Sequence, residues 1–449
     1  MRESQSPPTA SRPARRTTAP APAAAPPSST SRRDPHGSQT PAPRSKAEER
    51  RLAKAAERQL EDAQYVRVYT GIDRPFLILV LALLAFGIVM GFSASYSYAS
   101  YKYDDALYFF KRNLLFAALG IVAMFLCLYI PIEGVRMLTF PAYGAAIVLL
   151  LLVLIPGVGL KEGDAQRWLY IPGVGTFQPS ELAKLAMIMM MAWYITKFYD
   201  KITDNRPGGH PFLWGFCGCC CVFGLIAGLV ALEHHISGTL IIGAIGVVMM
   251  FVGRVKVKYL VIVAIILAAA AVLMIFVTGY GMTRVEVWKM VLFDPENIPA
   301  DIARDDAYQN LQGLYAIGSG GIFGVGLGNS FQKYGFVSQP QNDFIFSIIC
   351  EELGFIGALA VMALFLALAW RGYIIARNAP DLYSSLLVFG IVTQVTLQAL
   401  LNICVVTGTI PNTGISLPFF SSGGTSLVIL MVEMGIVLSI SRYSYQKRS

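Results

Sequence analysis

The sequence predicts an all-α polytopic membrane protein with about ten transmembrane helices. Of its 449 residues, 55% are hydrophobic and only 14% are charged, whereas about a quarter of the residues in soluble domains are charged. The mean hydropathy of +0.55 points the same way. A helix needs roughly 20 apolar residues to cross a bilayer. Windows of about that length occur at residues 75–95, 112–131, 138–156, 181–198, 211–231, 236–253, 258–278, 345–370, 383–407 and 420–441.

The first 74 residues differ in composition from this membrane domain, which spans residues 75–443. Ten of the 24 prolines precede residue 44 and are mixed with Ser, Ala, Thr and Arg, so the segment cannot bury enough apolar surface to offset the entropy of ordering. We expect a basic, largely disordered arm with a charged helix at residues 46–64. It is not a signal peptide, because no apolar core follows its arginines before Phe76. Residues 444–449 form a C-terminal tail.

The distribution of Lys and Arg predicts the orientation, because cytoplasmic segments carry more of them. The arm 1–74 holds 14, against 8 Asp and Glu. If the arm is cytoplasmic, the other cytoplasmic segments hold twelve, namely Arg136, Lys197, Lys201, Arg206, Arg254, Lys256, Lys258, Arg371, Arg377, Arg442, Lys447 and Arg448. The short external loops hold five, namely Lys102, Lys111, Arg112, Lys161 and Arg167. We expect both termini to be cytoplasmic, and we attribute the net charge of +8 to topology and the arm rather than to nucleic-acid binding.

The seven cysteines all lie in or beside apolar spans, and four of them form the cluster CGCCC at residues 217–221. No His or carboxylate neighbours this cluster, and a predicted helix contains it. Small apolar packing residues are the favoured interpretation over a metal site, and no disulfide framework is implied.

One predicted external loop, residues 279–344 between the seventh and eighth spans, is far longer than the others. Loops of this length are usually functional or disordered, and the aromatic and apolar residues throughout this one predict that it folds against the bundle. Its glycine run GSGGIFGVGLGNSFQK (318–333) lacks the GxxxxGK[ST] pattern of a phosphate-binding loop. Tight turns or close backbone packing explain these glycines. A lipid-linked phosphate approaching the exposed backbone is the second interpretation.

Glu181 and Lys184 are ionisable residues at the start of an otherwise apolar span, QPSELAKLAMIMMMAWYITKF (178–198). Three residues apart, they project from one helix face and can pair. One interpretation is a structural ion pair between helices. The other is a polar cavity or substrate path, because charges inside spans are costly and usually line such features. Lys184, near a helix N-terminus, suits a phosphate or carboxylate ligand.

Asp343 lies where the large loop enters the eighth span, in QNDFIFSIICEELG (341–354). It suits the N-cap of that helix, and it also suits a general base at the outer mouth of the bundle; the two roles do not exclude each other. Glu351 and Glu352 follow about two helical turns later, and Glu433 is a further span carboxylate. The spacing does not fix the faces that these three occupy.

A short external turn, LEHHISG (232–238), contains Glu233, His234 and His235. Adjacent histidines point in different directions on a helix, so a zinc site here would need ligands from elsewhere.

Three separated motifs resemble the FtsW/RodA/SpoVE (SEDS) family. IPNTGISLPFFSSGGTSL (410–427) resembles the C-terminal signature of that family, a Pro-x-Thr-Gly turn before a Pro-Phe-x-Ser-x-Gly-Gly segment. DAQRWLYIPGVGTFQPSELAKL (164–185) is similar to its upstream motif. DDAYQNLQGLYAIGSGGIFGVGLGNSFQKYG (305–335), followed by NDFIFSIICEELG (342–354), is similar to its large loop and following helix. The resemblance covers roughly residues 74–443.

The resemblance implies a peptidoglycan glycosyltransferase that polymerises lipid II at the outer face of the bacterial cytoplasmic membrane. It implies that Asp343 is the catalytic base and that Glu181 and Lys184 lie at the central cavity. Candidates for contacts with the lipid diphosphate are Arg167, Lys184 and Lys333, and Ser422 in the C-terminal signature is a further substrate-binding candidate. An α-linked donor would give a β-linked product in one inverting displacement. No cofactor is evident, and a divalent cation stays an open alternative.

The sequence departs from the family pattern in three places. Gln341 and Asn342 stand where many relatives have a His-Thr pair, VSQPQND (337–343) has no Glu after its Pro, and LEHHISG replaces a Gln-Pro-Asp type of turn. Asp343 itself is intact, so the departures concern auxiliary roles of the loop.

Two other functions compete with the glycosyltransferase, namely a lipid II flippase and a non-catalytic scaffold of the division complex. An enzyme requires Asp343, a scaffold tolerates its loss, and a flippase should depend more on Glu181 and Lys184. The segments YFFKRNLLF (108–116) and VEMGIVLSISR (432–442) favour the division and sporulation branches of the family. The expected partners are a class B penicillin-binding protein, which is a transpeptidase, and other divisome proteins.

Overall fold

The computed structural model describes residues 65–69, 71–162, 165–173, 175–204, 210–278, 280–294 and 306–447. The chain divides into two units, Met1–Glu61 and Asp62–Ser449. All described residues belong to the second unit. The predicted disordered arm before residue 65 and the predicted charged helix at 46–64 lie outside them.

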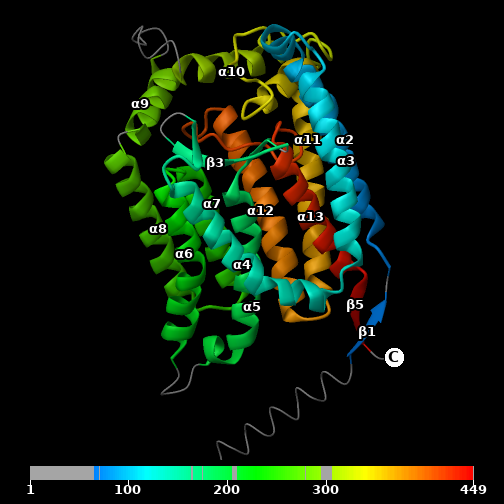
Figure 1. The fold of residues 1–449 in the computed structure, drawn as a ribbon, viewed down its shortest axis with the longest axis vertical. Helices are drawn as coiled ribbons and strands as arrows, with labels where there is room; N and C mark the ends of the chain where they lie inside the picture. Colours follow the sequence, from blue (N-terminus) through cyan, green and yellow to red (C-terminus); the bar gives the residue numbers. More distant parts are fainter. Residues whose placement is uncertain are drawn as a thin grey trace, which may run out of the picture. The chain divides into compact units, whose positions relative to one another are not determined.

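The second unit is a bundle of long helices, which confirms the predicted all-α polytopic fold (Figure 1). Its bundle helices are α2 (Arg74–Tyr103), α3 (Tyr108–Tyr129), α4 (Ile132–Leu154), α5 (Pro179–Thr203), η1 with α6 (Phe212–Cys217 and Gly218–Leu232), α7 (Ile236–Val252), α8 (Val257–Thr278), α11 (Ile345–Arg377), α12 (Leu382–Val406) and α13 (Gly424–Ser441). Each corresponds to one predicted span.

Among the described residues, seven helices are both long and apolar enough to cross a membrane: α2, α3, α4, α6 with η1, α11, α12 and α13. Helix α7 and the segment Val257–Ala270 of α8 are apolar but shorter. Helix α5 completes the predicted set, and its polar residues Glu181, Lys184, Lys197 and Lys201 explain its lower hydropathy. Most residues of α5 are nevertheless buried in the bundle.

Local signals explain where several helices begin. Asp73 caps α2 by accepting a hydrogen bond from the backbone N–H of Phe76 at 2.9 Å, with a proline in the first turn. Asp381 caps α12 in the same way through Ser384, at 2.8 Å. In contrast, α5 begins at Pro179 after Gln178, whose side chain makes no capping hydrogen bond.

Two strands that the sequence analysis did not predict join the ends of the membrane domain. Strand β1 (Tyr65–Tyr69) directly precedes α2, and β5 (Tyr443–Lys447) directly follows α13. They pair antiparallel, from Tyr65 opposite Lys447 to Tyr69 opposite Tyr443. Both ends of the membrane domain therefore lie on one side of the bundle, as an even number of spans requires. Helices α9 and α10 lie at the opposite end (Figure 1).

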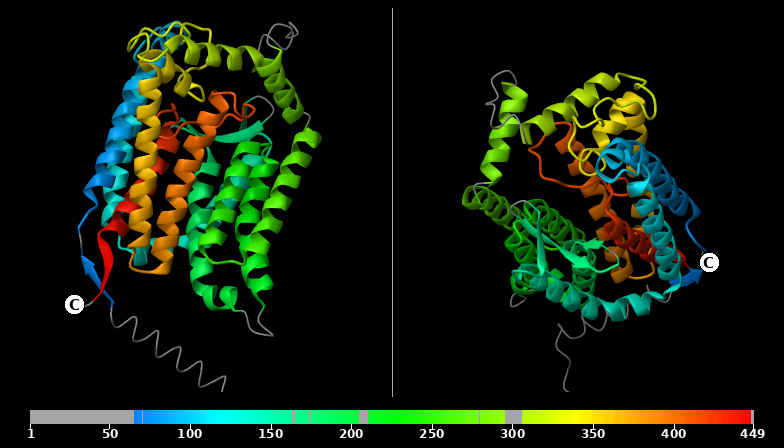
Figure 2. Two further views of the ribbon diagram at one scale, coloured as in Figure 1. Left: turned by 180° about the vertical axis from the view of Figure 1, so that it is seen from behind. Right: turned by 45° about the horizontal axis from the view of Figure 1, so that its top comes forward.

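A second small sheet connects α4 to α5. Its strands β2 (Gly159–Glu162), β3 (Ala165–Ile171) and β4 (Gly175–Phe177) are antiparallel in the order β2-β3-β4. The hydroxyl of Thr425 in α13 donates to the backbone carbonyl of Thr176 at 3.1 Å. This contact holds the sheet against the start of α13, on the same end of the bundle as α9 and α10 (Figure 2).

The described part of the large loop 279–344 contains two helices, α9 (Tyr280–Phe293) and α10 (Asp306–Gly320). They pack on each other through Val287, Val291 and Ala307, and α10 packs on α11. The prediction that the loop folds against the bundle is confirmed. Its two helices were not predicted.

The glycine run of this loop packs against a break in α11. Gly354 has φ +66°, so the helix is interrupted there. A Cβ atom on Gly324 would lie 2.2 Å from the backbone oxygen of Glu352, closer than any side chain allows. The backbone N–H groups of Val325 and Gly326 donate to the carbonyls of Glu351 and Glu352. Close backbone packing, the first of the two interpretations above, therefore accounts for these glycines.

The predicted orientation can be tested with two single cysteines in a variant whose seven native cysteines are replaced by Ser or Ala. Phe323, 80% exposed, lies in the large loop, and Lys201 is exposed at the end of α5. In intact cells, a membrane-impermeant thiol reagent should label Phe323→Cys and should reach Lys201→Cys only after permeabilisation. The opposite pattern would contradict the predicted topology.

Candidate functional site

A cavity lies between α5, α12, α13 and the segment that leads into α13. Its empty space is about 450 Å³, part of it open to solvent. The lining residues are Glu181, Gln394, Val395, Gln398, Ser416, Leu417, Pro418, Phe419, Ser421, Gly423, Ser426, Leu427, Leu430 and Glu433. Carboxylates, amides and hydroxyls thus face one space inside a largely apolar bundle. Such concave sites with a few convergent polar groups are typical of ligand pockets.

Glu181 and Lys184 form an ion pair at this cavity. The Nζ atom of Lys184 lies 2.9 Å from Oε1 of Glu181, and it donates a second hydrogen bond, also of 2.9 Å, to Oε1 of Gln398 in α12. The Lys184 residue is 3% exposed. The predicted pairing on one helix face is confirmed. Because charges are expensive to bury, these partners are what allows an ammonium group to remain there.

Two amides of the cavity, Gln394 and Gln398, were not singled out from the sequence, whereas Glu433 was noted there as a span carboxylate. Gln394 donates to Oε1 of Glu433 at 2.8 Å, and Gln398 donates to the backbone carbonyl of Ser416 at 3.2 Å. The signal was present, because Gln394 and Gln398 are four residues apart in an apolar helix and therefore share a face.

The C-terminal signature forms an extended segment that contacts residues 341–342 of the large loop. The Ser421 hydroxyl donates to the carbonyl of Asn342, and the Ser422 backbone N–H donates to the carbonyl of Gln341, both at 2.9 Å. The Ser422 hydroxyl also accepts from Asn113 of α3 at 3.3 Å. The segment that borders the cavity is thereby joined to the chain immediately before Asp343.

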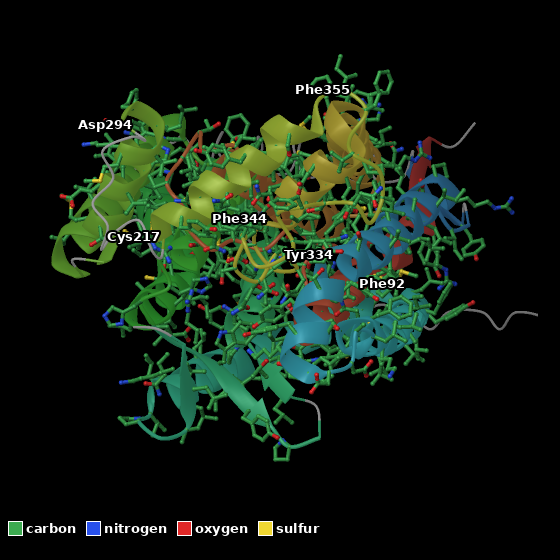
Figure 3. The ribbon with its side chains drawn as sticks, turned by 90° about the horizontal axis from the view of Figure 1, so that it is seen from above. Phe92, Cys217, Asp294, Tyr334, Phe344 and Phe355 are labelled. Carbon is green, nitrogen blue, oxygen red and sulfur yellow. The ribbon has the colours of Figure 1, made fainter. Side chains whose placement is uncertain are left out.

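Asp343 is half-buried and lies beside the Pro-x-Thr-Gly turn. Gly414 has φ +67°, and a Cβ atom there would lie 3.4 Å from Oδ2 of Asp343. The N-cap interpretation of Asp343 is wrong, because the N-cap of α11 is Phe344 and no side chain caps it. Asp343 belongs to the preceding turn instead. Viewed from above, Phe344 lies in projection between Phe92 of α2 and Cys217 of η1 (Figure 3).

The turn between α6 and α7 brings buried polar groups toward Arg167. Both carboxylate oxygens of Glu233 and Nδ1 of His235 are buried without a hydrogen-bond partner. Burial raises the pKa of Glu233 to about 8, opposed by the positive charge of Arg167. Burial, together with the positive charges of Arg167 and Lys184, lowers the pKa of His235 to about 3. Neutral side chains are therefore favoured at both positions.

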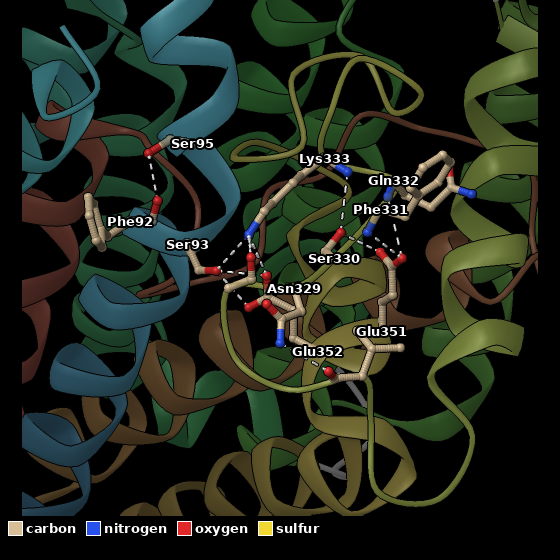
Figure 4. A network of polar contacts seen from close by, with 12 residues as sticks. Phe92, Ser93, Ser95, Asn329, Ser330, Phe331, Gln332, Lys333, Glu351 and Glu352 are labelled. Carbon is tan, nitrogen blue, oxygen red and sulfur yellow. Dashed lines mark hydrogen bonds and ion pairs between the residues drawn. The ribbon is translucent and has the colours of Figure 1, made fainter.

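Lys333 is in a different buried network (Figure 4). Its Nζ atom lies 2.9 Å from Oε1 of Glu352 and also donates to the carbonyl of Gly328, at 2.6 Å, and to the Ser93 hydroxyl, at 3.4 Å. Glu352 accepts from the Ser93 hydroxyl as well. This network joins the large loop to α11 and α2. The ammonium group is engaged in structural contacts, and Lys333 does not line the cavity.

The neighbouring carboxylate, Glu351, binds the same part of the large loop. It accepts from the Ser330 hydroxyl and from the backbone N–H groups of Phe331, at 2.9 Å, and Gln332, at 3.3 Å (Figure 4). The consecutive residues Glu351 and Glu352 therefore both hold loop 328–333 against α11. Within the described part of the chain, no three His, Cys, Asp or Glu side chains form a group that could hold a metal ion.

Sequence and structure comparisons relate this arrangement to known proteins. Residues 74–446 match the profile of the FtsW/RodA/SpoVE family, described as cell cycle proteins. Stage V sporulation protein E of Bacillus subtilis is 39% identical over 377 residues, which are 84% of this chain and 98% of that protein. The chain belongs to the FtsW/RodA/SpoVE family.

Other members of this family carry a name that states an activity. The probable peptidoglycan glycosyltransferase FtsW of Geobacter sp. strain M18 is 34% identical over 84% of this chain and 98% of its own length. The crystal structure of the rod shape determining protein RodA of Thermus thermophilus matches with a TM-score of 0.60 and 26% identity, over 83% of this chain and 98% of that one.

A further solved structure is that of a peptidoglycan synthase complex, described for its structural coordination of polymerization and crosslinking. One of its chains matches with a TM-score of 0.66 and 26% identity, over 83% of this chain and 98% of its own length. The family relationship therefore covers the whole bundle that holds the cavity.

Replacing Lys184 by Met should destabilise the bundle, because Glu181 would remain largely buried without its cation. Removing one partner of a buried ion pair costs about 3–5 kcal/mol. The thermal midpoint in detergent should therefore fall in Lys184→Met. It should recover in the double variant Glu181→Gln/Lys184→Met, since a neutral amide needs no counter-charge. Equal midpoints for the wild type and Lys184→Met would contradict a stabilising pair.

The pH dependence of the thermal midpoint should show the raised pKa of Glu233. A carboxyl group whose pKa is raised from 4.5 to about 8 in the folded state stabilises the fold fully below pH 4.5, and this contribution is lost as the pH rises to about 8. His235 has a lowered pKa, so its contribution to stability is lost only as the pH falls from about 6.5 to about 3. Between pH 6.5 and 8, Glu233→Gln should therefore lose less thermal stability than the wild type. Parallel midpoint curves for the two proteins would contradict the shift.

Proposed function

We propose that this protein is a peptidoglycan glycosyltransferase that polymerises lipid II into glycan strands during cell division. The observation that carries the proposal is the position of Asp343. Its carboxylate lies beside Gly414, in a turn hydrogen-bonded to the segment that borders the polar cavity. The activity named for the FtsW relatives supports the same reaction class.

The reaction needs a general base and a leaving group. The 4-hydroxyl of the acceptor sugar attacks the anomeric carbon of the donor, and Asp343 takes the hydroxyl proton. The bond between the anomeric carbon and the diphosphate oxygen breaks, and the lipid diphosphate leaves with that electron pair. Because the displacement inverts the anomeric carbon, an α-linked donor gives a β-linked strand and no covalent enzyme intermediate is needed.

Positive charge near the cavity would stabilise the departing diphosphate. Lys184 lies near the N-terminus of α5, whose dipole also favours an anion, and it binds Glu181 and Gln398, two residues that line the cavity. Arg167 lies on β3 near Glu233, and Ser422 adjoins the cavity through Ser421 and Gly423. Lys333 is the weakest of the proposed contacts, because Glu352 already neutralises its charge. A divalent cation bound with the diphosphate would act in the same way.

The proposed site faces the outside of the bacterial cytoplasmic membrane, with both termini cytoplasmic. That orientation rests on the Lys and Arg asymmetry, and it places loop 279–344 where lipid II is polymerised. A crosslinking partner is part of the proposal, namely a class B penicillin-binding protein, together with other divisome proteins. The similarity to a chain of a peptidoglycan synthase complex supports such a partner.

Asp343→Asn should abolish most glycan polymerisation. Asn keeps the size of Asp but does not accept a proton at neutral pH, and general-base catalysis contributes on the order of 10²–10⁴-fold. Because Phe344, and not Asp343, is the N-cap of α11, the helix should remain intact. The measurement is the rate of glycan formation from lipid II by the purified protein with its partner, with products separated by size.

Asp105→Asn is the matched control. Asp105 is an exposed carboxylate of the α2–α3 loop that pairs with Lys111 at 2.9 Å, so the same chemical change there should leave the rate unaltered. Polymerisation by Asp343→Asn within a few-fold of the wild type would refute the assignment of the base. A scaffold or a flippase would then be the better reading, and lipid II translocation in vesicles would separate those two.

A further inference from the structure

Asn402 is a fully buried amide near the C-terminal end of α12, with 0% of its surface exposed. Its Nδ2 atom donates two hydrogen bonds to main-chain carbonyls from distant parts of the sequence. One goes to Asp343 at 2.8 Å and the other to Ile415 at 2.6 Å. A single side chain thus joins α12, the end of the large loop and the C-terminal signature.

The orientation of this amide is determined by its surroundings. Turning it around would place Oδ1 against two carbonyl oxygens, and an amide oxygen has no proton to donate to them. In the observed orientation both N–H groups are used, and Oδ1 is buried without a hydrogen-bond partner. The arrangement satisfies the two carbonyls at the expense of the Asn402 oxygen. The Asn402 side chain therefore holds these two carbonyls in position.

The hydrogen bond to Asp343 acts on the residue whose carboxylate is the proposed base. Ser421 and Ser422 hold the two preceding residues from one side of the chain. Asn402 holds the carbonyl of Asp343 itself, immediately before α11 begins at Ile345. With the main chain fixed at this point, only two side-chain torsions remain to place the carboxylate beside Gly414.

We propose that Asn402 is a positioning residue, which fixes the Asp343 main chain and thereby the carboxylate. This inference rests on the proposed function of Asp343 as the base. Without the amide, two buried carbonyls lose their partner and the turn can rotate. A displacement of about 1 Å in a catalytic group can reduce a rate about 10²-fold. Asn402 itself does not touch the reacting atoms.

The test is a double-mutant cycle of Asn402→Leu and Asp343→Asn, assayed with lipid II and the crosslinking partner. Asn402→Leu should lower kcat about 10–100-fold and leave KM within about twofold, because substrate binding does not depend on the base. In the Asp343→Asn background, the same substitution should lower the residual rate less than about threefold, since no base remains to be misplaced. Losses that multiply would show a general structural role and overturn the proposal.

Two further variants keep the outcome interpretable. Asn402→Ser retains one O–H donor and should give a kcat between those of the wild type and Asn402→Leu. It also tests the proposal if Asn402→Leu fails to insert into the membrane, because its kcat should then still be below that of the wild type. Tyr383→Phe is the matched control, because it removes a buried hydrogen bond to Thr139, at 3.0 Å, near the other end of α12. It should lower the thermal midpoint and leave kcat unchanged. A kcat for Asn402→Ser as low as that of Asp343→Asn would contradict rescue by a donor.

The outcomes separate the inference from the proposed function. An Asp343→Asn protein that polymerises within a few-fold of the wild type would refute the proposed base. An impaired Asp343→Asn together with an Asn402→Leu protein whose kcat stays within about threefold of the wild type would refute the positioning role of Asn402 alone.

Discussion

The buried ammonium group of Lys184 constrains the whole centre of the bundle. A charge inside apolar helices is tolerated only when partners replace its water. One partner, Glu181, comes from the same helix, and the second, Gln398, comes from α12. Gln398 in turn donates a hydrogen bond to the carbonyl of Ser416. The partners of Lys184 are therefore connected to the C-terminal signature. The cavity is polar because these groups must gather around Lys184, and it lies where α5 and α12 meet.

The same face of α12 extends this polar region toward the large loop. Gln394, Gln398 and Asn402 are spaced by four residues. They form hydrogen bonds with Glu433, Lys184 and the main chain of Asp343, respectively. Four residues, a rise of about 6 Å at about 1.5 Å per residue, separate successive levels. The buried ion pair and the half-buried carboxylate are therefore held by neighbouring turns of one rigid helix. A rigid element gives a catalytic constellation more precision than loops alone could give it.

Features that depend on residues close together in the sequence were predictable. The ten spans follow from windows of apolar residues, and the Glu181–Lys184 pair follows from the spacing on one helix face. Contacts between distant segments were not predictable, because no local pattern encodes them. The β1–β5 pairing joins residues at the two ends of the membrane domain. The partner of Lys333 is Glu352, which a broken helix and a glycine turn bring to it. Sequence spacing alone could not separate this structural lysine from Lys184.

The two buried lysines show why charge alone does not locate the site. The side chains of Lys333 and Glu352 are 2% and 0% exposed, and Ser93 and a backbone carbonyl are further partners of the ammonium group. Glu181, by contrast, is 15% exposed and lines the cavity. The closed pair fastens the loop that ends at Asp343, whereas in the proposed function the open pair would exchange a protein partner for a substrate anion. The proposed function needs both pairs together, because the proposed base is useful only if its loop stays fixed beside the cavity where the anion would bind.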